Sequence, residues 1–208
     1  MQKRAKSKRD TYHVGNLAPQ LLSAARELLE QVGPTKLSLR AVSERVGVSS
    51  TAAYHHFANR SELISHLAAK GFRELAKALA QLNTGSTAQE KLRSACLAYF
   101  SFARRSPALY QLMFGPEFPS NGMIPELAEA RAQAFDELRG IVAEIMNADK
   151  NSPEIRRAAL ASWSYSHGLA SLVIHDILEF PPDTTDERFV DSTLQGFAFL
   201  FQLEAISH

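Results

Sequence analysis

The feature that most constrains the fold is residues 37–63, where two short helical patterns are separated by a single glycine. Ser38 is a suitable N-cap for the first pattern, because its hydroxyl can accept a hydrogen bond from the first turn. Apolar residues then recur on one helical face, at Leu39, Val42 and Val46. Gly47 predicts the left-handed end of this helix, and Ser49 can cap the next one. The stretch predicts two short helices joined by a tight turn.

The second short helix divides into a buried and an exposed face. Ala53 and Phe57 are four residues apart and can be buried together. Small and polar side chains are left pointing away from the core: Ser50, Thr51, Tyr54 and His55. A short helix that its neighbours hold in place, with such groups outward, has the shape that enters a DNA major groove. The pattern predicts a helix-turn-helix that reads DNA.

Four sequence runs are typical of one known family. They are Leu39-Arg40-Ala41-Val42, Val46-Gly47-Val48-Ser49, Tyr54-His55-His56-Phe57 and Asn59-Arg60-Ser61-Glu62-Leu63. In these runs the chain resembles the helix-turn-helix of the TetR family of bacterial transcriptional regulators, most specifically over residues 13–64. It departs from the family pattern at Thr51, where Gly is common, and at Ala52-Ala53, where a Thr-Leu or Thr-Ile pair is frequent. Because of these departures, the resemblance does not predict which DNA bases the protein prefers.

The resemblance implies an all-α fold of about nine helices in total. Residues 1–60 would form a basic arm and a three-helix DNA-binding domain, and residues 61–208 a helical ligand-binding and dimerisation domain. It also implies a homodimer on near-palindromic double-stranded DNA, acting as a repressor that a small-molecule effector releases. The residues expected to contact DNA are Ser38, Arg40, Ser49, Ser50, Thr51, Tyr54, His55 and Arg60. Among them His55 is the expected base reader, and Tyr54 and Arg60 are expected at the phosphate backbone.

The charge is unevenly distributed along the chain. Residues 1–60 contain ten Lys and Arg and four Asp and Glu, a net charge of +6, and the remainder contains thirteen and eighteen, a net charge of −5. A cationic surface at the helix-turn-helix end is what phosphate contact requires. Five of the ten positive charges precede Asp10. A basic arm at residues 1–12 therefore either runs along the DNA backbone or serves only as a solubilising tail.

The composition excludes several other classes of protein. The hydrophobic content of 45% is sufficient for a packed core, and the single cysteine, Cys96, excludes an internal disulfide framework. The sequence contains no run of about 18 apolar residues, which a transmembrane helix would need, so no membrane partner is expected. The basic N-terminus lacks the apolar segment of a secretory signal, and a cytoplasmic protein is expected.

Signals of catalysis and of metal binding are weak. The pairs His55-His56 and His175-Asp176 are adjacent, so their side chains would point about 100° apart on a helix and would not readily chelate one ion. No phosphate-binding glycine loop and no G-x-S-x-G motif occurs, and nothing near Cys96 indicates an activated thiol. We therefore expect a protein that is not an enzyme, with no cofactor and no metal.

The rest of the chain reads as helices separated by short breaks. Asn59 and Glu62 have capping-box spacing, and the helix that they start is expected to run to about residue 82. This helix would join the DNA reader rigidly to the C-terminal part of the chain. Gly33 and Pro34 end the first helix, which is expected over residues 16–32. Further helices are expected around residues 92–103, 108–114, 125–145, 153–180 and 186–206.

A W-x-x-x-H-G motif resembles the WHG-type C-terminal domain of one branch of the TetR family. Its Trp163 and His167 are four residues apart and share a helical face, where they either line a ligand cavity or belong to the core. The aromatic and methionine side chains in the middle of the chain allow the same two interpretations. A cavity there would take a small, largely apolar effector. The residues expected to line it are Tyr99, Phe102, Met113, Phe114, Trp163 and His167.

The last two helices are unusually apolar for a surface. Gly168 and Gly196 lie in mid-helix, where Gly costs about 1 kcal/mol relative to Ala and makes sense if another helix passes close. By resemblance to the TetR family, these helices would pair with a second copy across a two-fold axis, over residues 153–206. The residues expected at the interface are Leu169, Leu172, Val173, Phe197, Leu200 and Phe201. The alternative is that both helices are buried within one chain.

Three classes of function are compatible with these patterns. The chain is a DNA-binding regulator with or without a small ligand, a helical small-molecule binder or enzyme with a non-functional reader, or an interaction protein. The net charge of +6 at the reader end favours the first class, because a disused surface has no reason to stay basic.

Overall fold

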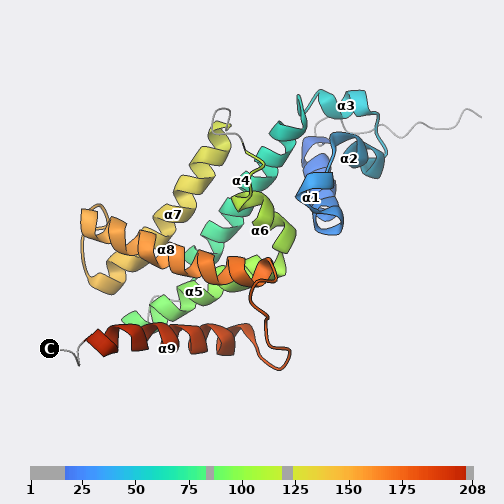
Figure 1. The fold of residues 1–208 in the computed structure, drawn as a ribbon. Helices are drawn as coiled ribbons and strands as arrows, with labels where there is room; N and C mark the ends of the chain where they lie inside the picture. The colour runs from blue at the N-terminus through green and yellow to red at the C-terminus, as the bar shows by residue number, and fades with distance from the viewer. Residues whose placement is uncertain (1–16, 83–86, 119–123, 205–208) are drawn as a thin grey trace, which may run out of the picture.

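The computed structural model describes residues 17–82, 87–118 and 124–204, with side chains described up to residue 199. Within these ranges every regular element is a helix and no strand occurs (Figure 1). The helices are α1 (Leu17–Lys36), α2 (Leu39–Val46), α3 (Ser50–Tyr54), α4 (Arg60–Ala80), α5 (Ala88–Arg105), α6 (Pro107–Phe114), α7 (Pro125–Met146), α8 (Pro153–Ile174) and α9 (Asp186–Glu204). The all-α prediction is confirmed. The expected basic arm at residues 1–12 lies outside the described residues.

Helices α1 to α3 cluster at one end of the molecule, and α4 leads from this cluster into the body (Figure 1). There α4 packs along α7, and α6 lies against both α1 and α4. Helix α5 packs against α7, α8 and α9. The body is therefore connected to the first three helices through α4 and α6, and not through a flexible linker.

The short helices begin and end where the sequence places capping residues. The Ser38 hydroxyl accepts a hydrogen bond from Ala41 N at 3.2 Å, and the Ser49 hydroxyl accepts one from Ala52 N at 3.1 Å. Gly47 ends α2 with a φ of 78°, a left-handed conformation that costs glycine little. These caps turn the chain sharply between α2 and α3 as predicted.

The hydrophobic core runs without interruption from α1 to α8. Along α4, Leu63 and Leu67 are buried near the α1–α3 cluster, and Leu75 and Leu79 are buried in the body. Each fully buried leucine contributes about 1.5–3 kcal/mol to folding. The division of the chain at residue 60 stays a functional prediction, because packing continues across it.

One helix ends where the sequence predicts, and another ends earlier. The segment labelled α1 continues to Lys36, but Gly33 has a φ of 76° and a ψ of 168°, so the regular helix is broken at the glycine as expected. Helix α8 ends at Ile174, and the expectation that it runs to about residue 180 is wrong. Asp176 adopts a left-handed φ of 55°, and Ile177 N donates to Leu172 O at 2.9 Å, which closes the helix end.

Helices α4 and α6 approach each other closely at Gly71. A Cβ atom at this position would lie 2.5 Å from Met113 Sδ and 2.9 Å from Leu109 Cδ2. Both of those side chains are buried, with 0% and 1% exposed, so a Cβ atom at Gly71 would have to displace packed side chains. The close contact between α4 and α6 therefore depends on the absence of a side chain at residue 71.

We predict that Gly71→Ala lowers the free energy of unfolding by roughly 1–3 kcal/mol, the usual cost of overpacking a core. Gly140→Ala on α7 is the matched control. A Cβ there would meet nothing nearer than Lys150 Nζ at 3.7 Å, so this change should stabilise the helix by up to about 1 kcal/mol. Urea unfolding of both variants measures the difference. Equal stabilities for the two variants would contradict the close approach.

Candidate nucleic-acid interface and ligand groove

Helix α3 is seated on the core by one face and exposed on the other. Ala53 and Phe57 are 0% and 3% exposed, and the hydroxyls of Ser43 and Ser50 lie 3.3 Å apart where α2 meets α3. The side chain of Tyr54 is on the other face and the residue is 53% exposed. Thr51 and His55 are also exposed. Three of the four predicted outward residues, Thr51, Tyr54 and His55, are thus exposed together, whereas Ser50 is partly buried.

The remaining residues of the predicted DNA surface have structural partners. Ser38 and Ser49 cap α2 and α3, and Ser50 is partly buried against α2. Arg40 is largely exposed, and its Nε donates to Glu44 Oε1 at 2.9 Å. Exposed ion pairs of this kind are weak, so the Arg40 guanidinium can exchange Glu44 for another anion at little cost.

Arg60 differs from the expectation that it faces phosphate. Its Nε donates to Leu37 O at 2.8 Å, and a second nitrogen donates to Pro34 O. Its remaining nitrogen pairs with Glu117 Oε2 at 3.0 Å. The guanidinium therefore ties the first turn of α4 to the end of α1, to Leu37 just after it, and to the segment after α6. We call this contact the Arg60–Glu117 bridge.

A groove opens in the body between α4, α6, α7 and α8. Its volume is about 380 Å³, within the range of small-molecule sites. The lining residues are Phe72, Met113, Phe114, Gly115, Arg131, Phe135, Leu160 and Trp163. The walls are aromatic and aliphatic apart from Arg131. Met113, Phe114 and Trp163 were predicted to line a ligand cavity, and the structure brings these three together.

The other predicted ligand residues, Tyr99, Phe102 and His167, are not among the residues that line the groove. Tyr110 Oη is 2.6 Å from His167 Nδ1, and Tyr99 Oη is 3.2 Å from the same atom. Burial raises the pKa of both phenols and lowers the pKa of the His167 imidazole, so all three groups are neutral near pH 7. Both phenol oxygens lie within hydrogen-bonding distance of Nδ1, and the tautomer of His167 decides which atom donates. Phe102 is buried and is not among the lining residues.

Arg131 is one of the lining residues that were not among the predicted ligand residues, and it is the charged one. Leu127 and Leu138 are buried in the inward stripe of α7, and Arg131 and Phe135 fall on the same helical face. A charged residue within an inward apolar stripe is the signal that would have identified it. Phe72 also lines the groove, although its spacing along α4 indicates only a core position.

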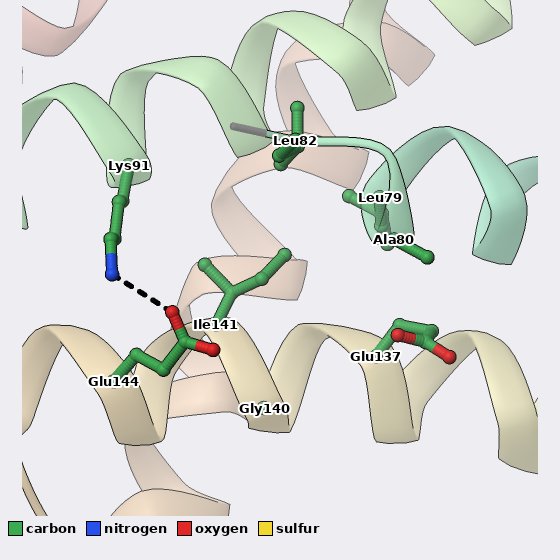
Figure 2. A pocket seen from close by; sticks show the side chains of 8 residues that line it. All are labelled: Leu79, Ala80, Leu82, Lys91, Glu137, Gly140, Ile141 and Glu144. Atoms are coloured by element: carbon green, nitrogen blue, oxygen red, sulfur yellow. Dashed lines mark hydrogen bonds and ion pairs between the residues drawn. The ribbon is translucent and has the colours of Figure 1, made fainter. Parts of the chain in front are cut away.

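A second hollow, at the far end of α4, is smaller (Figure 2). Its volume is about 110 Å³, which is below the usual size of a ligand site. Lys91 Nζ donates to Glu144 Oε2 at 2.8 Å across it, and this ion pair joins α5 to α7 (Figure 2). We therefore treat the groove at Trp163, and not this hollow, as the candidate ligand site.

The outer faces of α8 and α9 carry exposed apolar side chains. Leu172 and Phe197 are 41% and 42% exposed, whereas Leu169 and Val173 are half-buried. A Cβ atom at either mid-helix glycine would meet no described atom within 4 Å, so no other described helix of this chain passes close to them. The side chains of Leu200 and Phe201, also predicted at an interface, lie outside the described residues.

Over the described ranges, no helix is long and apolar enough to cross a membrane. In the same part of the chain, no group of three or more His, Cys, Asp or Glu side chains is arranged to hold a metal ion.

Comparison with known proteins gives two family matches and several relatives. FasR of Mycolicibacterium smegmatis, an HTH-type transcriptional activator, is 25% identical over 143 residues, which cover 68% of this chain and 64% of FasR. A protein with unknown function from Rhodococcus sp. RHA1 has a structure with a TM-score of 0.74 and 30% identity, covering 91% of this chain and 97% of that one. FadR of Bacillus subtilis, solved in complex with stearoyl-CoA, has a TM-score of 0.65 at 17% identity and covers 85% and 95%.

The chain spans between half and two thirds of the length of the curated relatives that it matches. Residues 21–67 match the model for bacterial regulatory proteins of the tetR family. Residues 92–197, about half of the chain, match the model for the tetracyclin repressor-like C-terminal domain. These two matches include α3 and every lining residue of the groove except Phe72, and the chain belongs to the TetR family.

Proposed function

We propose that this protein is a sequence-specific DNA-binding transcriptional regulator, a repressor that a small-molecule effector releases. The observation that carries the proposal is the exposed face of α3, where Thr51, Tyr54 and His55 project from a helix that caps and core contacts hold in place. Such a helix is suited to insertion into a major groove. The net charge of +6 in residues 1–60 supplies attraction to phosphate.

The exposed residues divide into two roles. His55 and Thr51 carry donors and acceptors that are suited to base edges, and Tyr54 and Arg40 are suited to the phosphate backbone. Ser38, Ser49 and Ser50 support the surface mainly by fixing the ends of α2 and α3. Arg60 is assigned to the bridge with Glu117 and not to direct phosphate contact.

We predict that His55→Ala reduces discrimination between the DNA flanking the gene for this protein and random DNA by roughly 1–3 kcal/mol, because a base contact is lost. Tyr54→Ala should instead weaken binding to both DNAs, because a phosphate contact carries no sequence information. Fluorescence anisotropy with labelled duplexes at fixed salt measures both effects. His175→Ala, at an exposed histidine in the body, is the control. Wild-type binding by the His55 and Tyr54 variants would reject this surface.

The apolar outer face of α8 and α9 supports a homodimer. Leu172 and Phe197 expose large apolar side chains, and the space beside Gly168 and Gly196 is open to a helix from a second copy. Burying such a face against an identical one removes apolar surface from water. A dimer would present two α3 helices to one duplex, as a near-palindromic operator requires.

We predict that Leu172→Glu converts a dimer to a monomer at micromolar concentration, because a charge would be buried in the interface. Folding should persist, since Leu172 is 41% exposed in the single chain. Ala128→Glu, at an exposed position of α7, adds the same charge elsewhere and should leave the dimer intact. Sedimentation velocity distinguishes the two species. A wild-type monomer under these conditions would contradict the dimer.

The Arg60–Glu117 bridge supports a connection between the groove and the DNA-reading helix. Phe114 and Gly115 line the groove, and the chain leads directly from them to Glu117. Arg60 in turn donates to backbone carbonyls at the end of α1 and at Leu37. An effector that displaces the end of α6 would strain this bridge and shift the reader relative to α4. The fold is compatible with ligand binding, since FadR of Bacillus subtilis was solved with stearoyl-CoA.

We predict that Glu117→Ala weakens DNA binding without ligand by roughly 0.5–2 kcal/mol, because the reader loses a contact that fixes its position. Loss of a negative charge would by itself strengthen binding to DNA, because it reduces repulsion of the phosphates. Weaker binding by the Glu117 variant would therefore be explained by loss of the bridge and not by the change in charge. Glu144→Ala removes an ion pair of the body and the same charge, and should not weaken binding. Anisotropy titrations compare both variants with the wild type. Unchanged or tighter binding by the Glu117 variant would exclude this role for the bridge.

A further inference from the structure

The first turn of α6 is capped by a residue of another helix. Ser106, at the N-cap position, makes no side-chain hydrogen bond to this turn, and Pro107 has no N–H to donate. The next two backbone N–H groups, those of Ala108 and Leu109, donate to the two carboxylate oxygens of Glu30 on α1, at 3.2 and 3.3 Å. Glu30 therefore does for α6 what an N-cap residue usually does within its own helix.

This cap holds α1 and α6 together. Ala108 and Leu109 are 8% and 1% exposed, so water has limited access to the turn. A buried N–H group without a partner is unfavourable, and a carboxylate at a helix N-terminus interacts favourably with the helix dipole. Arg26, one turn before Glu30, adds a hydrogen bond across the same contact, from Nη2 to Ser106 Oγ at 2.6 Å. Polar contacts thus fasten α1, a helix of the α1–α3 cluster, to the start of α6.

The start of α6 is also connected to α9. Only Ser106 separates α6 from α5, and α9 lies alongside α5 (Figure 1). Arg104, near the end of α5, pairs with Asp186 in the first turn of α9. Arg93, earlier on α5, donates two hydrogen bonds to Asp191, at 2.5 and 2.9 Å. Bidentate pairs of this kind specify an orientation. A series of contacts therefore leads from α9 through α5 and α6 to α1.

The α1–α3 cluster is attached to α6 and the segment after it at two separate places. One is the Arg60–Glu117 bridge, just beyond the end of α6, and the other is the Glu30 contact at its start. Helix α6 has 8 residues, so at 1.5 Å per residue the two attachments are about 12 Å apart. One attachment would let the cluster pivot about it. Two attachments at this separation restrain that movement.

We infer that Glu30 is a positioning residue that fixes the distance between the two α3 helices of the dimer. The inference rests on the proposed function, because it requires α8 and α9 to pair with a second copy. Helix α9 belongs to that interface and α1 to the DNA-reading cluster, and the Glu30 contact completes the connection between them. A duplex presents two half-sites at one spacing. A dimer already held near this spacing loses less conformational freedom on binding.

The distance between the two α3 helices is measurable without DNA. We would attach nitroxide labels at Thr51→Cys, on the exposed face of α3, and measure label-to-label distances by double electron–electron resonance. The single cysteine, Cys96, is buried, and alanine replaces it in every labelled sample. We expect one narrow distribution when Glu30 is kept and a broader one for Glu30→Ala. Glu30→Gln keeps one acceptor oxygen and should give an intermediate width.

Glu27→Ala is the matched control. Glu27 carries the same charge on the same helix, but it pairs with Arg45 inside the α1–α3 cluster, at 3.6 Å. Its loss should leave the distribution narrow. In unlabelled protein that keeps Thr51 and Cys96, Glu30→Ala should weaken binding to the flanking DNA by roughly two- to thirtyfold. Glu27→Ala should bind at least as tightly as the wild type, because loss of a negative charge reduces repulsion of the phosphates. Fluorescence anisotropy measures both affinities.

The outcomes separate the inference from the proposed function. Equal widths with Glu30 and with Glu30→Ala, or equal broadening by Glu27→Ala, would overturn the inference, as would unchanged DNA affinity of Glu30→Ala. Thermal melts establish that each variant is folded. If Glu30→Ala is unfolded, Glu30→Gln decides, and a width equal to that of the unchanged residue would also overturn the inference.

In each of these cases, a narrow distance and specific DNA binding by the chain that keeps Glu30 leave the proposed function standing. If that chain gives no label-to-label distance, or if the wild type binds no specific DNA, the proposed function itself fails and the inference fails with it.

Discussion

Burial of Ala53 and Phe57 gives α3 a fixed position, because a helix of five residues makes too few hydrogen bonds to be stable alone. The apolar contacts of these two side chains replace the stability that the short helix lacks. Its other face is then free to carry Thr51, Tyr54 and His55 to a ligand as large as a duplex. Helix α3 is therefore rigid because it packs on the core behind it. A movement of that core would move α3 as a unit.

Helix α4 is the element through which such movement would pass. Its buried stripe belongs to the cluster of α1 to α3 at Leu63 and to the body at Leu75, with no break between them. Arg60, at its first turn, adds a polar contact that reaches from the reader to Glu117 beyond α6. Glu117 follows the groove residues Phe114 and Gly115 closely in sequence, so the chain itself joins the groove to the Arg60–Glu117 bridge.

The sequence predicts local features of this molecule better than distant ones. Caps such as Ser38 and Gly47 were identified because their signals are contained within a few residues. The end of α8 was misplaced because Asp176, and not glycine, takes the left-handed conformation there. The Arg60–Glu117 pair joins residues far apart in the chain, and no local pattern indicates it. Arg131 interrupts the inward apolar stripe of α7, which marks it as unusual, but the spacing along α7 does not show which helices surround it.

The central claim is that two copies of this chain present α3 to one DNA duplex. Hydroxyl-radical footprinting of the DNA flanking the gene, with the full-length protein, tests it most directly. The account predicts two protected segments related by two-fold symmetry, with centres one or two helical turns apart, at about 10 base pairs a turn. A single protected segment without symmetry, or no protection at concentrations where the protein is folded and dimeric, would contradict it.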